Sequence, residues 1–125
     1  MSGFTFDSNI IIDVLQGLPQ ARAELVRGVE RGRVWLSRIV WIEVLSKGVD
    51  QGSKRAEHLL SGFGIDELDE EIAGRAAALR REREGLKVPD AIILATAQVR
   101  GRILVTRNTK DFLAQMPGVR VPYTL

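Results

Sequence analysis

Residues 88–108 read VPDAIILATAQVRGRILVTRN, and this stretch decides the fold class. Pro89 is favoured in a first helical turn and an apolar run follows it, so we expect a helix from Val88 to Val99. Gly101 ends that helix, and Ile103–Val105 then has the character of a buried strand. A helix that leads directly into a buried strand is typical of a parallel sheet covered by helices.

The rest of the chain continues this alternation of strands and helices. Short apolar segments predict strands, segments with helical spacing of apolar residues predict helices, and Gly, Pro and capping residues mark their ends. The alternation therefore predicts one α/β domain over residues 1–125. The other predicted strands are 4–6, 34–36, 65–68 and 119–121, and the other predicted helices are 8–15, 20–32, 38–48, a helix that Ser53 opens and Gly62 stops, 69–84, and a short one capped by Thr109.

The composition limits the chemistry that the chain can carry. Apolar residues make up 45% and charged residues 27% of 125 residues, as in ordinary globular proteins. There is no cysteine and only one histidine, so disulfides and thiolate zinc sites are excluded and any metal ligands must be oxygens. Oxygen ligands suit magnesium, manganese or calcium. With no signal peptide and no apolar run long enough to span a bilayer, we expect a cytoplasmic location.

Acidic residues from distant segments are predicted to meet at one end of the sheet. Functional groups gather at the carboxyl ends of parallel strands, where the crossover helices also begin. Asp7 directly follows the first strand, Asp90 lies in the first turn of the helix before the fourth, and Asp111 follows that strand. Glu43 lies further along its helix, but its long side chain could reach back. Such a cluster needs a cation, and magnesium would activate water toward a phosphodiester.

Each acid also has a plain structural explanation. Asp7 could simply cap a helix, and Asp90 gains about 0.3–1 kcal/mol from the helix dipole whatever its function. Asp111 could simply lie in a first helical turn, where Asp is common. Glu43 is the telling residue, because it lies in an almost wholly apolar helix where an unpaired carboxylate is costly. A structural role there requires a Lys or Arg partner.

Polar and basic residues beside the acids are candidates for supporting roles. Ser8, Asn9, Thr106 and Asn108 could orient ligands, water or a phosphate, although all four also suit turns. Asp13 is expected on the surface or behind the metal ligands, and His58 as a surface or packing residue. The basic side chains predicted to meet phosphates at the rim of the site are Lys87, Arg107 and Lys110.

Four segments together resemble the PIN-domain ribonucleases, and among them the VapC-type toxins of toxin–antitoxin pairs. The resemblance covers nearly the whole chain and implies a three-layer sandwich around a central parallel sheet of four to five strands. The segments are Phe6-Asp7-Ser8-Asn9 with Asp13, Ser37 to Gly48 with Glu43, Pro89-Asp90-Ala91-Ile92-Ile93-Leu94-Ala95-Thr96-Ala97, and Leu104-Val105-Thr106-Arg107-Asn108-Thr109-Lys110-Asp111-Phe112.

The resemblance also implies an activity, a cofactor and a partner. It implies cleavage of single-stranded RNA with magnesium, or manganese, held by Asp7, Glu43 and Asp90 as metal ligands. Many relatives have a fourth acid where this chain has Asn108, which leaves Asp111 as the nearest carboxylate and the fourth catalytic candidate. It further implies a toxin dimer and a small antitoxin whose C-terminal segment blocks the active groove.

An antitoxin helix could bind between the helices that flank Asp7 and Glu43. The first four helices carry more apolar residues than one sheet face requires, and most of these residues could simply be core. A groove between the helices that flank Asp7 and Glu43 would nevertheless suit an amphipathic peptide. Trp41 or Leu45 is the expected contact. The apolar residues concerned are Ile11, Ile12, Leu15, Leu18, Val40, Trp41, Val44 and Leu45.

Three other interpretations compete with the nuclease. A phosphoacceptor receiver domain needs paired acids after the first strand and a lysine after a late strand, and a haloacid-dehalogenase-like phosphatase needs Asp-x-Asp where this chain has Asp7-Ser8-Asn9. A non-catalytic domain that binds RNA or a partner also remains open. Clustered negative charge repels RNA and would not help a domain that only binds it, so the acids favour the nuclease.

Overall fold

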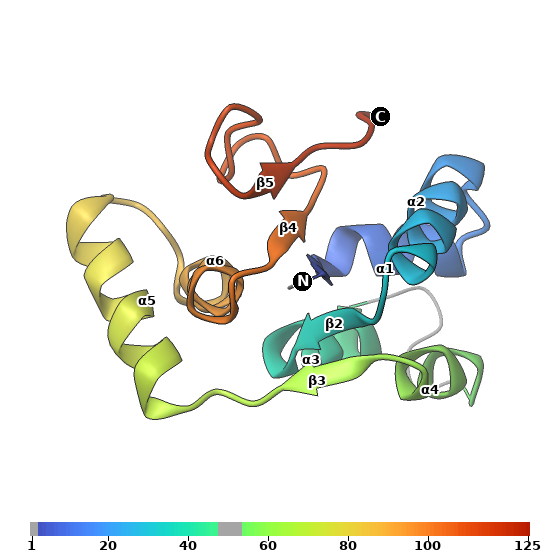
Figure 1. The fold of residues 1–125 in the computed structure, drawn as a ribbon, viewed down its shortest axis with the longest axis horizontal. Coiled ribbons are helices and arrows are strands. Elements are labelled where there is room, and N and C mark those ends of the chain that lie inside the picture. Colours follow the sequence, from blue (N-terminus) through green and yellow to red (C-terminus); the bar gives the residue numbers. More distant parts are fainter. Residues whose placement is uncertain (1–2, 48–53) are drawn as a thin grey trace.

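The computed structural model describes residues 3–47 and 54–125, and a five-stranded parallel sheet lies at its centre (Figure 1). The strand order is β3-β2-β1-β4-β5, and each neighbouring pair is parallel. This arrangement confirms the predicted α/β class and its parallel sheet. The strands are β1 (Phe4–Phe6), β2 (Val34–Ser37), β3 (Gly64–Asp66), β4 (Ile103–Val105) and β5 (Val119–Arg120).

Helices cover both faces of the sheet. In Figure 1, α5 and α6 lie on one side and α1, α2 and α4 on the other, which gives three layers. The predicted helix boundaries at Gly48 and Ser53 lie outside the described residues. None of the helices in the described part of the chain is long and apolar enough to cross a bilayer. The helices are α1 (Ser8–Leu15), α2 (Pro19–Glu30), α3 (Arg38–Lys47), α4 (Lys54–Ser61), α5 (Glu70–Glu82) and α6 (Val88–Arg100).

Helix α6 is the central helix of the fold. Every residue from Ala91 to Ala97 is buried, which explains why its sequence is apolar on all sides. Pro89 lies in its first turn, and Gly101 ends it in the left-handed region at φ 66°. The chain then enters β4 at once, so the Asp90 end of α6 lies at the carboxyl edge of the sheet.

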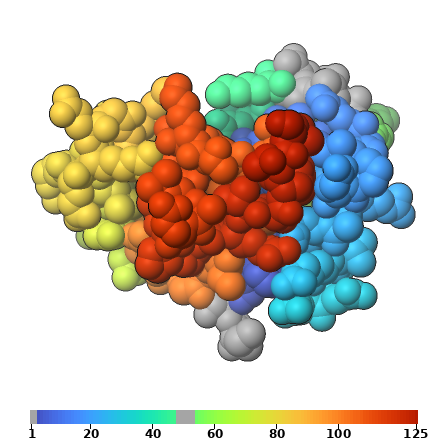
Figure 2. Space-filling view, turned by 90° about the horizontal axis from the view of Figure 1, so that it is seen from above, coloured from blue at the N-terminus to red at the C-terminus, as the bar shows by residue number. Residues whose placement is uncertain are grey.

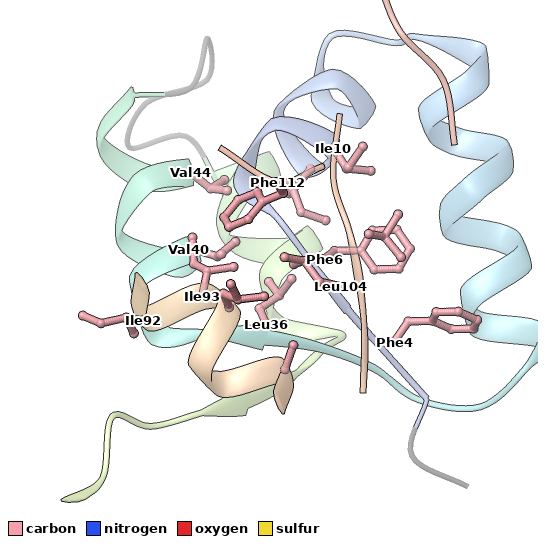
Figure 3. Close-up of a cluster of buried hydrophobic side chains, with 14 of the residues drawn as sticks. Phe4, Phe6, Ile10, Leu36, Val40, Val44, Ile92, Ile93, Leu104 and Phe112 are labelled. Carbon is pink, nitrogen blue, oxygen red and sulfur yellow. The ribbon is translucent and has the colours of Figure 1, made fainter. Parts of the chain in front are cut away.

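The core joins the sheet to both helical layers (Figure 3). The buried side chains include Phe6 of β1 and Leu104 of the adjacent strand β4. They also include Ile93 of α6 and Phe112 of the loop that follows β4, and all four are fully or almost fully buried. The Phe6 ring lies on the α2 face of the sheet, where a Cβ on Gly28 would lie 3.1 Å from it, so α2 packs very closely on β1. This packing fixes the end of β1, where Asp7 begins α1.

Two predicted elements differ from the structure. The third strand was expected at 65–68 but ends at Asp66, because its partner β2 ends at Ser37 and leaves no strand to pair with Leu68. The short helix expected from Thr109 is absent, and residues 109–116 form turns and bends. Arg83 donates to the carbonyl oxygens of Asp111 and Lys110, so the groups that a helix would use are bonded elsewhere.

Candidate functional site

Asp7 lies where β1 passes into α1, and both oxygens of its buried carboxylate are held. Its backbone N–H donates to Val105 O at 2.9 Å, which extends the β1–β4 pairing to the site. Oδ1 accepts from the Ser8 N–H at 2.7 Å as the helix cap, and Oδ2 accepts from Thr106 Oγ1 at 2.7 Å and from Asn9 Nδ2 at 3.3 Å. Burial raises the pKa of Asp7, and the bond from Thr106 opposes that rise.

Glu43 reaches back from α3 to the same place, as expected of its long side chain. Ser8 Oγ donates to Glu43 Oε1 at 3.0 Å and lies 3.4 Å from Asp7 Oδ1, so this hydroxyl bridges two of the predicted acids. Lys47, one turn along α3, lies 3.4 Å from Oε2 and supplies the basic partner that a structural role would need. The Lys47 side chain is 68% exposed, so this pair contributes little stability.

Asp90 joins these acids from the first turn of α6. The pKa of its half-buried carboxyl is raised to about 6, chiefly because burial disfavours the charged form. The neighbouring cation Lys87 lowers it, which places this lysine near the cluster. The next largest contributions to the raised pKa come from three other carboxylates, those of Asp111, Asp7 and Glu43. The four predicted acids therefore share one electrostatic environment.

The fourth position is shared between an amide and a carboxylate. Asn108 Nδ2 donates to Asp111 Oδ2 at 2.8 Å, and Asn108 Oδ1 accepts from the Asp111 N–H at 3.1 Å. The Asn108 N–H in turn donates to Thr106 Oγ1 at 3.0 Å. Asn108 thus fixes the Asp111 side chain, while Thr106 connects this loop to Asp7.

Comparison with known proteins identifies the fold that carries this site. A family model described as the PIN domain matches residues 4–118. The chain belongs to the PIN-domain family. This membership excludes the receiver-domain and phosphatase alternatives. A comparison of this PIN domain with curated proteins finds no match.

Solved structures resemble this PIN domain over nearly its whole length. A chain in the toxin–antitoxin complex from Klebsiella pneumoniae is 43% identical, with a TM-score of 0.85 over 98% of this chain and 100% of that one. A chain of FitAcB from Neisseria gonorrhoeae is 25% identical, with a TM-score of 0.76 over 98% and 99%. A chain of VapBC2 from Rickettsia felis, bound to a promoter DNA fragment, is 20% identical, with a TM-score of 0.73 over 94% and 95%, and supports the fold alone.

The acids of the PIN domain fit magnesium by chemistry, although the carboxylates of Asp7, Glu43 and Asp111 are already bonded to protein groups. In residues 3–47 and 54–125, no three or more Asp, Glu or His side chains stand close enough to hold a metal ion directly. Magnesium keeps several waters and needs only one or two carboxylates in direct contact. Oxygen donors and uncompensated negative charge around Asp90 therefore suit this ion.

Asp13 lies behind the predicted metal ligands, the second of the two places expected for it, and it binds Arg107. Asp13 is 2% exposed, and Arg107 Nε and Nη2 donate to its carboxylate at 2.6 and 3.0 Å. Tyr123 donates to the same carboxylate at 2.8 Å. Since its guanidinium is held in this way, Arg107 is not the free phosphate contact that we expected. Its backbone N–H instead donates to Asn9 Oδ1 at 3.3 Å, which links the ion pair to Asp7. His58 is exposed, as expected.

The raised pKa values predict that the metal-free PIN domain is less stable at neutral pH than at mildly acidic pH. The folded-state pKa of Asp90 lies above its ordinary value of 3.8, so the free energy of unfolding falls as the pH rises from about 4 to about 6. Asp7 acts in the same direction. Because Asp90 is half-exposed, we expect a contribution on the order of 1 kcal/mol. Urea unfolding in EDTA at a series of pH values measures this contribution. If the free energy of unfolding of Asp90→Asn depends on pH as steeply as that of the parent, the assignment is contradicted.

Proposed function

We propose that this PIN domain is a magnesium-dependent endoribonuclease of the VapC type that cleaves single-stranded RNA. The observation that carries the proposal is the convergence of Asp7, Glu43, Asp90 and Asp111 from four separate segments. Such a concentration of like charge raises pKa values and destabilises a fold, so it calls for a function. An RNA substrate also fits the cytoplasmic location that we propose.

Each side chain has a definite task in this proposal. Asp7, Glu43 and Asp90 would hold the metal, in part through its bound waters, with manganese as a substitute for magnesium. When bound, the ion supplies a Lewis acid that makes water a better nucleophile toward a phosphodiester. Ser8 fixes Glu43 against Asp7, and Thr106 and Asn9 fix the second oxygen of Asp7.

The fourth acid completes the arrangement. Asn108 fixes Asp111, whose charge acts on Asp90, and the Asp111 carboxylate would lie beside the reacting phosphate. Asn108 itself has no charge to bind metal strongly. We therefore assign the fourth catalytic position to Asp111, with Asn108 as the residue that positions it.

The partner that we propose is a small antitoxin. The 43% identical structure is a toxin–antitoxin complex, and the resemblance to VapC-type toxins implies neutralisation by such a partner. We propose that this chain forms the same kind of hetero-oligomer, in which the toxin is a dimer. Trp41 and Leu45 are partly exposed on α3 beside α1, where an apolar peptide helix could contact them.

RNA cleavage tests the proposed function directly. The purified chain is incubated with a mixed pool of single-stranded RNA, with magnesium or with EDTA, and the products are separated by length. We expect cleavage only with magnesium. Binding of RNA without cleavage under either condition would instead support the non-catalytic domain.

Trp41→Asp is predicted to weaken the antitoxin complex, because a buried interface aromatic commonly contributes about 2 kcal/mol or more. The small protein encoded beside this chain would be co-expressed with it, and retention on the tagged toxin measured. Val29→Asp on α2 is the matched control, because Val29 is 58% exposed. Equal retention by both variants would exclude α3 from the antitoxin interface.

A further inference from the structure

A basic groove runs between α2 and the C-terminal segment, away from the carboxylates. Two neighbouring hollows, of about 470 and 310 Å³, are both lined by Arg27 and Arg120. Figure 2 shows the C-terminal segment, in red, beside the blue helices of the N-terminal half. We call the two hollows the α2–β5 groove. Its apolar floor is formed by Phe4, Ile103, Val119 and Val121.

The groove keeps positive charge after its internal ion pairs are counted. Its charged side chains are three arginines and Glu24, which gives a net charge of +2. Arg120 Nε lies 3.0 and 3.1 Å from the two oxygens of buried Glu24, and Arg27 lies 3.7 Å from the same carboxylate. Arg31 is exposed and has no side-chain ion pair with any residue that the structure describes. Arg27 and Arg31 are one helical turn apart, so both side chains lie on the same face, and both line the larger hollow.

The proposed active site provides little of this attraction beyond the exposed side chains of Lys87 and Lys110. Its acids repel a polyanion, Lys47 is paired with Glu43, and the Arg107 guanidinium is bound by Asp13. A nuclease nevertheless needs cations that hold the RNA backbone while the reaction takes place. The α2–β5 groove offers them on a neighbouring surface.

We propose that the α2–β5 groove binds the backbone of single-stranded RNA outside the active site. This inference rests on the proposed function for its substrate class. The groove ends at Tyr123, whose hydroxyl donates to Asp13, and Asp13 binds Arg107 beside Asn9 and the Asp7 cluster. A strand in the groove can therefore continue toward the carboxylates. Its phosphates pair with the arginines, and the apolar floor accepts ribose or base faces.

Salt-dependent binding of a single strand tests the groove without requiring cleavage. The probe is a uridine strand of about 20 nucleotides, longer than one binding site of this size. Affinity is measured in EDTA over a range of salt for the parent, for Arg27→Glu with Arg31→Glu, and for Arg81→Glu. Arg81 is the matched control, because it is also an exposed arginine in the last turn of a helix. Thermal unfolding checks that each variant is folded.

We expect the groove variant to lose affinity about tenfold or more, with a salt slope shallower by about 1.4, while the control changes little. An equal loss in Arg81→Glu or an unchanged affinity in the groove variant would overturn the inference. Groove-dependent binding by a chain that never cleaves RNA would reject the nuclease and keep the groove. Magnesium-dependent cleavage with groove-independent binding would reject the groove alone.

Discussion

Asp90→Asn is expected to lower magnesium-dependent RNA cleavage about a thousandfold or more, because a lost metal ligand removes several kcal/mol of transition-state stabilisation. The metal-free fold should become as stable as the parent or more stable. In the parent, burial and then the charges of Asp111 and Asp7 raise the pKa of the Asp90 carboxyl to about 6. The neutral amide of the variant is not repelled by these charges. Initial cleavage rates and the unfolding midpoint in EDTA measure the two effects.

Asp7→Asn should give the same loss, because the amide keeps the cap geometry at the start of α1 but not the charge. Glu70→Gln is the matched control, since Glu70 is an exposed acid in the first turn of α5, as Asp90 is in that of α6. It should retain full activity. Magnesium should raise the unfolding midpoint of the parent and of this control. The rise should be much smaller in Asp7→Asn and in Asp90→Asn. Full activity in both Asp variants would remove the site.

The convergence of the acids was predictable because it follows from backbone topology. Asp7 directly follows a strand, and Asp90 opens the helix that returns to the next strand in the sheet. Parallel pairing brings both to one edge whatever their side chains do. Glu43 required an additional assumption about side-chain reach, and the bond from Ser8 agrees with it.

The loop after β4 could not be predicted in the same way. Local sequence favoured a helix from Thr109, but Arg83, 28 residues before Asp111, takes the carbonyl oxygen of that residue. Asn108 is hydrogen-bonded to Asp111 through both the nitrogen and the oxygen of its side-chain amide. In a short polar segment, such side-chain hydrogen bonds can satisfy the backbone in place of helical bonds at little cost in free energy. The spacing of apolar residues in the sequence does not reveal them.

The buried ion pair of Asp13 and Arg107 was also hidden, since it joins residues 94 apart in the chain. Its only local signal is the position of Asp13 on the same helix as Ile10 and Ile11, which are completely buried. A carboxylate among such neighbours requires a partner, and the sequence alone offers 18 Lys and Arg residues to choose from. The structure identifies the partner and places it at the edge of the site.

Arg107→Ala is predicted to destabilise the fold by about 3 kcal/mol, because it leaves a buried carboxylate without its cation. For a chain of this length, the unfolding midpoint should fall by about 10 °C. Tyr123 would still donate to Asp13, but one neutral bond does not replace a bidentate ion pair. Calorimetry in EDTA measures the change. Lys110→Ala, an exposed neighbour in the same loop, is the control and should unfold as the parent does.

The double variant Asp13→Asn with Arg107→Gln separates the buried charge from the lost packing. Removing both charges should recover much of the stability that Arg107→Ala loses, because no carboxylate then remains buried and unpaired. RNA cleavage should recover with it if the pair acts only by holding the loop that bonds Asn9. A midpoint for Arg107→Ala equal to that of the parent would show that Asp13 does not depend on Arg107. Full stability of the double variant with cleavage still lost would instead place the Arg107 side chain in contact with RNA.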